Sequence, residues 1–180
     1  TGLGSNIMFA QMHIDAAASL GMNPITIFAG QNAGARQYRR VRQTLWICLG
    51  CVTVVGLVLG SLAYALGPSL LSIYITDSAE AISYGLIRLA FICLPYFLCG
   101  LMDVTTGALR GIGASFVPML ISILGVCGLR IVWIYTIFQI PEFHTPQCLY
   151  FSYTVSWIIT FIAQLIAFFV VYRRQASAAE

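Results

Sequence analysis

One stretch sets the direction of the whole chain: Gly30-Gln31-Asn32-Ala33-Gly34-Ala35-Arg36-Gln37-Tyr38-Arg39-Arg40-Val41-Arg42. It holds four of the nine basic residues, and apolar segments lie on both sides of it. Since four arginines are not stable in hydrocarbon, the chain must leave the bilayer here. Short arginine-rich loops stay on the cytoplasmic side during insertion. We therefore place this stretch inside, and the direction of every other segment follows by alternation.

The composition is that of a membrane protein. Of the 180 residues, 59% are hydrophobic and only 8% are charged, whereas soluble domains carry about 25% charged residues. The mean hydropathy is +0.89. The sequence therefore predicts an all-α integral membrane protein with the lipid bilayer as its surroundings. A nucleic-acid partner is not expected, because no exposed face interleaves basic and aromatic residues.

A membrane-spanning helix needs about 20 mostly apolar residues. We expect five such helices, at about 5–30, 44–66, 81–109, 116–138 and 148–172. Arg36, Arg39, Arg40 and Gln43 recur at spacings of three and four. This spacing predicts a separate short amphipathic helix on the membrane surface, before the second span. Residues 176–180 are expected to form a disordered cytoplasmic tail.

The remaining charges agree with this orientation. The expected outside loops hold Asp77, Glu80 and Glu142 and no basic residue. The expected inside loops hold seven arginines: Arg36, Arg39, Arg40, Arg42, Arg110, Arg173 and Arg174. The C-terminus is therefore expected in the cytoplasm and Thr1 outside. A chain that starts outside without a signal-peptide pattern is expected to be part of a longer protein with an upstream helix.

Two features inside the spans predict close packing or bending. Gly56 and Gly60 form a G-x-x-x-G pattern, which lets a neighbouring helix approach closely. Pro95 in the third span removes a backbone donor, so a distortion is expected there. Such distortions occur where membrane helices line a cavity, and they also occur for packing alone.

Asp103 is the main candidate for a functional residue. A carboxylate at membrane depth costs at least about 2.5 kcal/mol, so it must face the bundle interior or water. Thr106 lies one turn further on, and Gly107 leaves room beside the backbone. This set suits binding of Na⁺, or of a proton if burial favours the neutral acid. The alternatives are an ion pair with Arg110 or Arg130 that only orients helices, or a carboxylate solvated near the interface.

Three further charges lie within the expected spans. Arg130 and Asp103 should differ by roughly 10–15 Å in depth, so a direct salt bridge is not expected. Arg130 either extends toward the interface or faces a cavity. In a cavity it would bind a substrate or take part in gating. Asp15 is either a second cavity carboxylate or a residue near water in the outer half of the first span. Arg88 is expected to extend toward the outer interface.

No catalytic set is visible, so the protein is not expected to be an enzyme. No Ser-His-Asp combination lies on one side at a common depth. Gly30-x-x-x-Gly34 follows a helix and lacks the lysine of a phosphate-binding loop. Cys48 and Cys51 form a C-x-x-C without a second pair of ligands. No metal site is expected, apart from Na⁺ at Asp103, and no cofactor is expected.

Two stretches together resemble the multidrug and toxic compound extrusion (MATE) family. One is Phe28-Ala29-Gly30-Gln31-Asn32-Ala33-Gly34-Ala35-Arg36-Gln37-Tyr38-Arg39-Arg40. The other runs from Gly100-Leu101-Met102-Asp103 through Gly107-Ala108-Leu109-Arg110-Gly111-Ile112-Gly113 and is followed by Pro118. The resemblance marks Gly30, Gln31, Asn32, Gly34, Arg110 and Gly111 as signature residues of cytoplasmic loops.

The resemblance implies a fold and a function. Residues 1–175 would form a partial C-terminal lobe, equivalent to helices eight to twelve of a twelve-helix, two-lobe transporter. Members of the family expel organic, often cationic, drugs in exchange for Na⁺ or H⁺, in many cases with an acidic residue on the tenth helix. Asp103 matches that residue. The partners would be a drug-like small molecule and the missing N-terminal lobe, and the location would be the plasma or inner membrane.

Two other functions remain open at this point. A flippase of the same superfamily moves lipid-linked sugars and should line its cavity with several cationic residues, for which Arg88 and Arg130 are the candidates. A non-transporting membrane scaffold is the alternative from another class. Asp103 and Arg130 at depth argue against it, because an anchor gains nothing from that cost.

Overall fold

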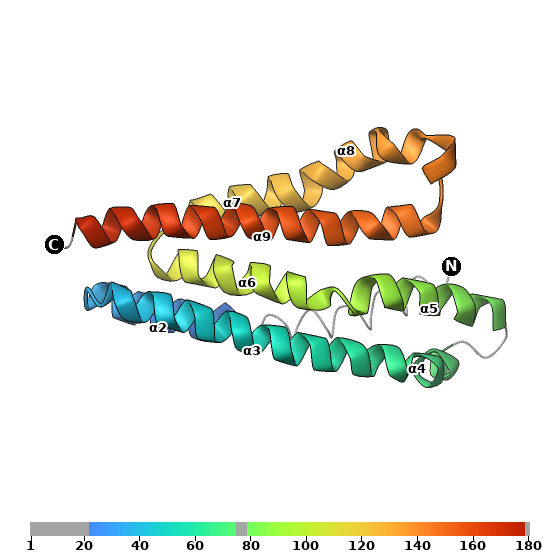
Figure 1. Ribbon diagram of the computed structural model, residues 1–180, viewed down its shortest axis with the longest axis horizontal. Helices are drawn as coiled ribbons and strands as arrows, with labels where there is room; N and C mark the ends of the chain where they lie inside the picture. Colours follow the sequence, from blue (N-terminus) through green and yellow to red (C-terminus); the bar gives the residue numbers. More distant parts are fainter. Residues whose placement is uncertain (1–21, 75–78, 179–180) are drawn as a thin grey trace.

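In the computed structural model, residues 22–74 and 79–178 are described, and all of their regular elements are helices (Figure 1). In chain order they are α2 (Met22–Gly34), α3 (Tyr38–Ala65), α4 (Gly67–Tyr74), α5 (Ala79–Cys93), α6 (Tyr96–Gly111), α7 (Phe116–Ser122), the π-helix η1 (Ile123–Gly128), α8 (Leu129–Tyr135), the 3₁₀ turns η2 (Ile137–Gln139) and η3 (Pro141–Phe143), and α9 (Pro146–Ser177).

Four helical segments are long and apolar enough to cross a membrane: Tyr38–Ala65, Gly85–Gly111, Phe116–Gln139 and Pro146–Ser177. They correspond to the second to fifth predicted spans, so the chain is a multi-pass membrane protein. Of the first predicted span, 5–30, only the part from residue 22 onward lies within the described residues. Asp15 lies outside them.

The arginine-rich stretch differs from its prediction. α2 continues to Gly34, four residues beyond the predicted end at residue 30. The chain then turns at Arg36, which has a φ of 56°, and Tyr38 already begins α3. The separate amphipathic helix predicted from Arg36, Arg39, Arg40 and Gln43 is therefore wrong. α3 is continuous from Tyr38 to Ala65, so the basic residues after Arg36 lie in its first turns.

The third span is broken, as its proline predicted. α5 ends at Cys93 and α6 begins at Tyr96, because Pro95 lacks a backbone donor. The break lies against Gly56 and Gly60 of α3. A Cβ on Gly56 would lie 2.8 Å from the Cβ of Phe97, and one on Gly60 would collide with the carbonyl oxygen of Cys93. The predicted packing role of the G-x-x-x-G pattern is confirmed.

The last two spans also depart from regular or predicted form. Within the fourth span, η1 widens the helix between α7 and α8. α9 runs through Ser177, so the disordered tail predicted from residue 176 is wrong at its first two residues. The end of α9 is held to the end of α6, because the side-chain amide of Gln175 donates to the carbonyl oxygen of Ile112 at 2.8 Å.

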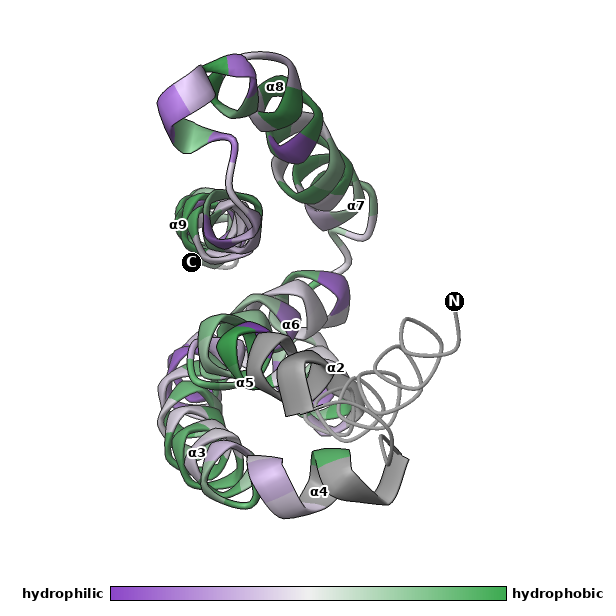
Figure 2. Ribbon diagram, turned by 90° about the vertical axis from the view of Figure 1, so that its right-hand side faces the viewer, coloured by the Kyte–Doolittle hydropathy of each residue, from purple (hydrophilic) through white to green (hydrophobic). Residues whose placement is uncertain are grey.

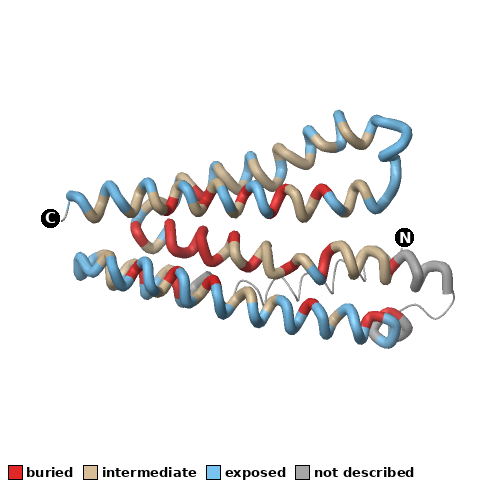
Figure 3. The backbone as a smooth tube through the Cα atoms, viewed as in Figure 1, coloured by how far each residue is buried: buried red, intermediate tan, exposed pale blue. Residues whose placement is uncertain are grey.

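α6 is the central helix of the described part. It packs against α2, α3 and α9. α9 in turn also packs against the α7–α8 segment, and Figure 2 shows α9 and α7 side by side above α6. Buried residues concentrate on α6 and on the facing sides of α3 and α9, whereas the outer sides of α3 and α7–α8 are exposed (Figure 3). Ile47 and Leu124 are about two-thirds exposed, at 65% and 67%. Such apolar outer faces suit contact with lipid.

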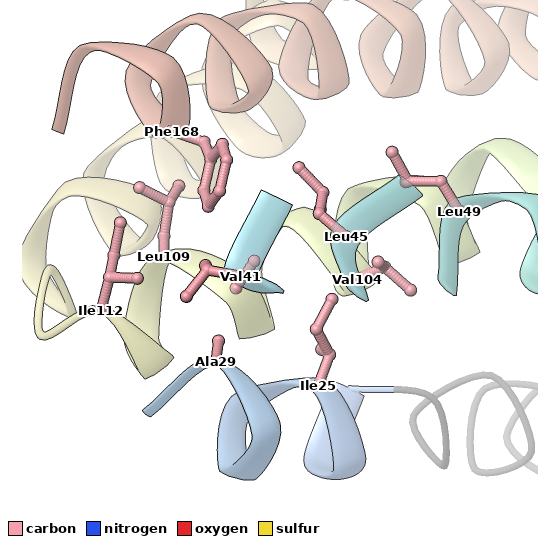
Figure 4. Close-up of a cluster of buried hydrophobic side chains, with 10 residues drawn as sticks. Ile25, Ala29, Val41, Leu45, Leu49, Val104, Leu109, Ile112 and Phe168 are labelled. Atoms are coloured by element: carbon pink, nitrogen blue, oxygen red, sulfur yellow. The ribbon is translucent and has the colours of Figure 1, made fainter. Parts of the chain in front are cut away.

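The core lies toward one end of the molecule, where α2, α3, α6 and α9 meet (Figure 4). Its labelled side chains are Ile25, Ala29, Val41, Leu45, Leu49, Val104, Leu109, Ile112 and Phe168. At the same end the rings of Tyr38 and Tyr172 make an edge contact, with centroids 6.1 Å apart. This contact joins the start of α3 to the end of α9. The end of α2, the start of α3 and the ends of α6 and α9 thus lie at one end of the molecule (Figure 1). These segments and the turn between α2 and α3 hold seven arginines: Arg36, Arg39, Arg40, Arg42, Arg110, Arg173 and Arg174.

Candidate functional site

Asp103 lies on α6 and is half-buried. The next residues along the helix, from Val104 to Leu109, are all buried. Thr106, three residues on and 7% exposed, shares a side of the helix with Asp103. The hydroxyl of Thr105 instead donates to the carbonyl oxygen of Leu101 at 2.8 Å. Asp103 and Thr106 thus lie on one side of α6, a helix that packs against α2, α3 and α9.

The two predicted signature turns meet directly. A Cβ on Gly30 would lie 3.3 Å from the carbonyl oxygen of Gly111, and one on Gly111 would lie 2.6 Å from the Cβ of Ala29. The hydroxyl of Thr26 donates to the carbonyl oxygen of Gly107 at 3.1 Å. α2 and α6 therefore approach at backbone distance, beginning one turn beyond Asp103. A side chain at Gly111 would force a shift, whereas one at Gly30 would be a tight contact.

The neighbouring signature residues complete the end of α2. The side-chain amide of Asn32 donates to the carbonyl oxygen of Phe28 at 2.7 Å. Gly34 is the last residue of the helix, and the backbone N–H of Gln37 donates to the carbonyl oxygen of Asn32 at 2.8 Å. Gln31 and Arg110 are exposed. Asn32 and Gly34 thus shape the turn that follows α2.

Arg130 contacts α9. Its Nε donates to the hydroxyl oxygen of Ser156 at 3.3 Å, and its Cζ lies 3.9 Å from the ring centroid of Tyr153. The expectation that Arg130 makes no direct salt bridge to Asp103 stays a prediction.

The Tyr153 ring that contacts Arg130 belongs to a group of aromatic side chains. Trp157 makes edge contacts with the rings of Tyr96 and Tyr153, at centroid distances of 5.9 and 6.2 Å. Trp157 and Tyr96 are buried together with Ile92. We call Arg130, Tyr153, Ser156 and Trp157 the Arg130 cluster. It lies where α8, α9 and the start of α6 come together.

Asp103 lies on the same side of α6 as Cys99. Cys99 packs against the cluster of Ile92, Tyr96 and Trp157. Asp103 is four residues after Cys99, so it lies one turn further along the helix, a rise of ~6 Å.

A buried polar stripe on α9 continues from the Arg130 cluster. Its members recur every four residues and are all buried: Ser152, Ser156, Thr160 and Gln164. The side-chain amide of Gln164 donates to Ser122 Oγ at 2.9 Å, while its own Oε1 has no partner among the described residues. Thr160 faces Gly125 of η1, where any Cβ would collide with its hydroxyl. This stripe was missed from the sequence, although its four-residue spacing within an apolar span is a visible signal.

Arg88 lies near the other end of the molecule. Its Cζ is 6.0 Å from the ring centroid of Tyr150. Tyr150 is the fifth residue of α9, which begins at Pro146. The Nε of Arg88 is buried without a described partner. Its described contact is thus with the start of α9, and its expected extension toward the outer interface stays a prediction.

Comparisons with known proteins agree on one family. The MatE family model matches residues 1–136. The chain is similar to the probable multidrug resistance protein YoeA of Bacillus subtilis, with 30% identity over 116 residues, which are 64% of this chain and 24% of that protein. It thus spans about a quarter of the length of this relative.

Among solved structures, the fold matches the crystal structure of the Vibrio cholerae MATE transporter VcmN in its bent form. The TM-score is 0.70 at 17% sequence identity, and the match covers 93% of this chain and 42% of that chain. At this identity the match concerns the fold alone. Since the family model spans most of its residues, this chain belongs to the MatE family, the multidrug and toxic compound extrusion family that its sequence resembles.

Proposed function

We propose that the protein containing this chain is a secondary active efflux transporter, which exports organic, often cationic, drugs in exchange for Na⁺ or H⁺ by alternating access. Residues 1–175 would form part of its C-terminal lobe, as the equivalents of helices eight to twelve. The family membership and the similarity to a probable multidrug resistance protein support this proposal. The end that carries the seven arginines would face the cytoplasm, in the plasma or inner membrane.

The observation that carries the proposal is the position of Asp103. It is a half-buried carboxylate on a helix packed by three others, within an apolar span. Carboxylates at this depth are costly and mark ion or proton pathways. Asp103 would bind the coupling cation, with Thr106 as a neighbouring oxygen ligand if the cation is Na⁺. Binding and release of that cation would bias the two access states.

The test uses the full-length protein in an efflux-deficient, drug-sensitive host. Efflux of ethidium is compared for wild type and Asp103→Asn at equal membrane levels, with a Na⁺ gradient and with a proton gradient. Glu142→Gln, which changes an exposed carboxylate in the η3 turn, is the matched control. We expect Asp103→Asn to abolish efflux and Glu142→Gln to leave it unchanged. The gradient that drives wild-type efflux identifies the ion.

Other outcomes would redirect the proposal. If Asp103→Asn extrudes ethidium like wild type, coupling through Asp103 is wrong and the carboxylate only orients helices. If wild type extrudes no dye with either gradient, the efflux proposal fails. The flippase alternative then comes first, and translocation of a lipid-linked sugar becomes the next assay.

A further inference from the structure

We infer that the open groove between the start of α3 and the end of α9 binds an anionic phospholipid, with the lipid phosphate against Arg42 and the acyl chains over Trp46 and Ile47. The occupant is a lipid of the membrane leaflet that meets the arginine-rich end of the molecule. This lipid is a partner that the proposed function does not include, and its binding does not depend on drug export.

The groove opens toward the outside of the described helices. It has a volume of about 820 Å³ and is lined by Arg42, Gln43, Trp46, Ile47 and Phe169. The first four of these side chains belong to α3, and all four are exposed. The rings of Trp46 and Phe169 are in contact, with centroids 6.4 Å apart, so α3 and α9 form the two walls. A molecule that lies beside the protein in the membrane can therefore enter the groove.

Both walls pass from charged to apolar sequence at the groove. On α3, Arg42 is the last charged residue before an apolar run that contains no Asp, Glu, Lys, Arg or His until Asp77. On α9, Phe169 lies one turn before Arg173, the first charged residue of that helix. Such a border is typical of the layer where lipid headgroups meet hydrocarbon, and tryptophan is enriched in this layer. We therefore place the groove at headgroup depth, with Trp46 as an interfacial ring.

The charges on the two walls are all positive. Arg39 is three residues before Arg42 and lies on the same side of α3, and Arg173 lies on the same side of α9 as Phe169. These three arginines are exposed. Neither α3 nor α9 contains an aspartate or a glutamate. Basic pockets between membrane helices bind anionic headgroups, and each arginine near the surface adds to the attraction.

An apolar surface continues from the groove into the span. Ile47, Val54 and Val58 follow one another at spacings of seven and four residues, so they lie along one side of α3. All three are more than half exposed. A free phosphate ion or a soluble acidic peptide would contact the arginines and leave this surface uncovered. A phospholipid carries a phosphate and acyl chains in one molecule, so it fits both parts of the site.

The test counts the lipids that stay bound to the purified full-length protein in detergent, by native mass spectrometry. The protein is offered equal amounts of dioleoyl phosphatidylglycerol and dioleoyl phosphatidylcholine. The first lipid is anionic, whereas the second has the same acyl chains and no net charge. Any difference in binding between them therefore comes from the headgroup.

Two matched pairs of variants separate charge from shape. Arg42→Gln removes the arginine of the groove, and Arg40→Gln removes an exposed arginine that lies ~160° away around the axis of α3. Ile47→Trp fills the groove without changing its charge. Val54→Trp adds a similar bulk at an exposed position on the same side of α3, about two turns further along.

We expect wild type, Arg40→Gln and Val54→Trp to retain phosphatidylglycerol in preference to phosphatidylcholine. Arg42→Gln should weaken the binding of phosphatidylglycerol about fivefold, the effect of one arginine near an anionic membrane surface, and change that of phosphatidylcholine by less than about twofold. Arg42→Lys should keep most of the binding, since lysine also binds phosphate as a point charge. Ile47→Trp should weaken the binding of phosphatidylglycerol at least as much as Arg42→Gln does.

Three results would overturn the inference. Equal retention of the two lipids by wild type would show that no site selects an anionic headgroup. Equal weakening by Arg42→Gln and Arg40→Gln would show that the whole arginine-rich end attracts the lipid. Unchanged binding in Ile47→Trp would show that the lipid binds elsewhere, as when another part of the full-length protein covers the groove. The measurement involves no transport, so its outcome is separate from that of the Asp103→Asn efflux test.

Discussion

Arg130 lies with its Cζ 3.9 Å from the ring centroid of Tyr153, and this contact joins α8 to α9 inside an apolar span. It belongs to a series that runs in antiparallel order along the two segments. Ser122 meets Gln164, and Gly125 meets Thr160. Polar contacts thus hold the α7–α8 segment to α9. Apolar contacts alone would give little preference for α9, because an apolar helix face packs about as well against lipid as against another helix.

Replacing Tyr153 tests the cation–π part of this contact. Tyr153→Phe keeps the ring and should leave the thermal stability of the full-length protein in detergent nearly unchanged. Tyr153→Leu should lower it, since a partly desolvated cation–π contact contributes about 0.5–2 kcal/mol. The same two changes in an Arg130→Gln background separate ring packing from charge. An equal loss for Tyr153→Leu in both backgrounds would show that only packing is involved.

The sequence predicted the spans well because their signals are local. Apolar length and the placement of arginines can be read from short stretches of sequence. Pro95 likewise indicates a helix break by itself, because proline lacks a backbone donor. The separate surface helix was wrong for a related reason: the three- and four-residue spacing of Arg36, Arg39 and Arg40 is a helical signal, but it does not say where the helix ends. α3 simply continues into the membrane.

The missed features depend on contacts between distant residues. η1 lies where Gly125 meets Thr160 of α9, and Gly125 alone carries no sign of this. The partners of Arg130 are 23 and 26 residues away, so they follow from the register between α8 and α9. That register depends on the connection through η2 and η3 between the two helices. Sequence patterns do not specify the geometry of such a connection. Asp103 was found because a carboxylate in an apolar span is unusual in any register.

Two glycines of α3 provide a matched pair for packing. A Cβ on Gly60 would collide with the backbone carbonyl of Cys93, whereas nothing lies within 4 Å of one on Gly50. Gly60→Ala should therefore destabilise the protein, by about 1–3 kcal/mol as for other overpacked sites. Gly50→Ala should be neutral or stabilising by up to about 1 kcal/mol, because alanine favours helix. Thermal denaturation of both variants in detergent checks this, and similar midpoints would contradict close packing at Gly60.

The contact between η1 and α9 should show as non-additivity. Gly125→Ala places a methyl group against the Thr160 hydroxyl and should lower thermal stability. Thr160→Ala should also cost stability, since it leaves space in a buried stripe. The double variant should be more stable than the sum of the two losses predicts, because the new methyl then fills the vacated space. Gly128→Ala, whose Cβ would lie 4.0 Å from its nearest neighbour, is the control.

The orientation of the arginine-rich end can be measured by labelling. In a full-length background without native cysteines, Glu142→Cys and Ser177→Cys each place one thiol at an exposed position, at opposite ends of the described spans. Because arginine-rich segments stay inside during insertion, Ser177→Cys should react with a membrane-impermeant maleimide only after the cells are permeabilised. Glu142→Cys should react in intact cells. The reverse pattern would show that the seven arginines lie outside, and it would also turn the coupling and export directions of the proposed function around.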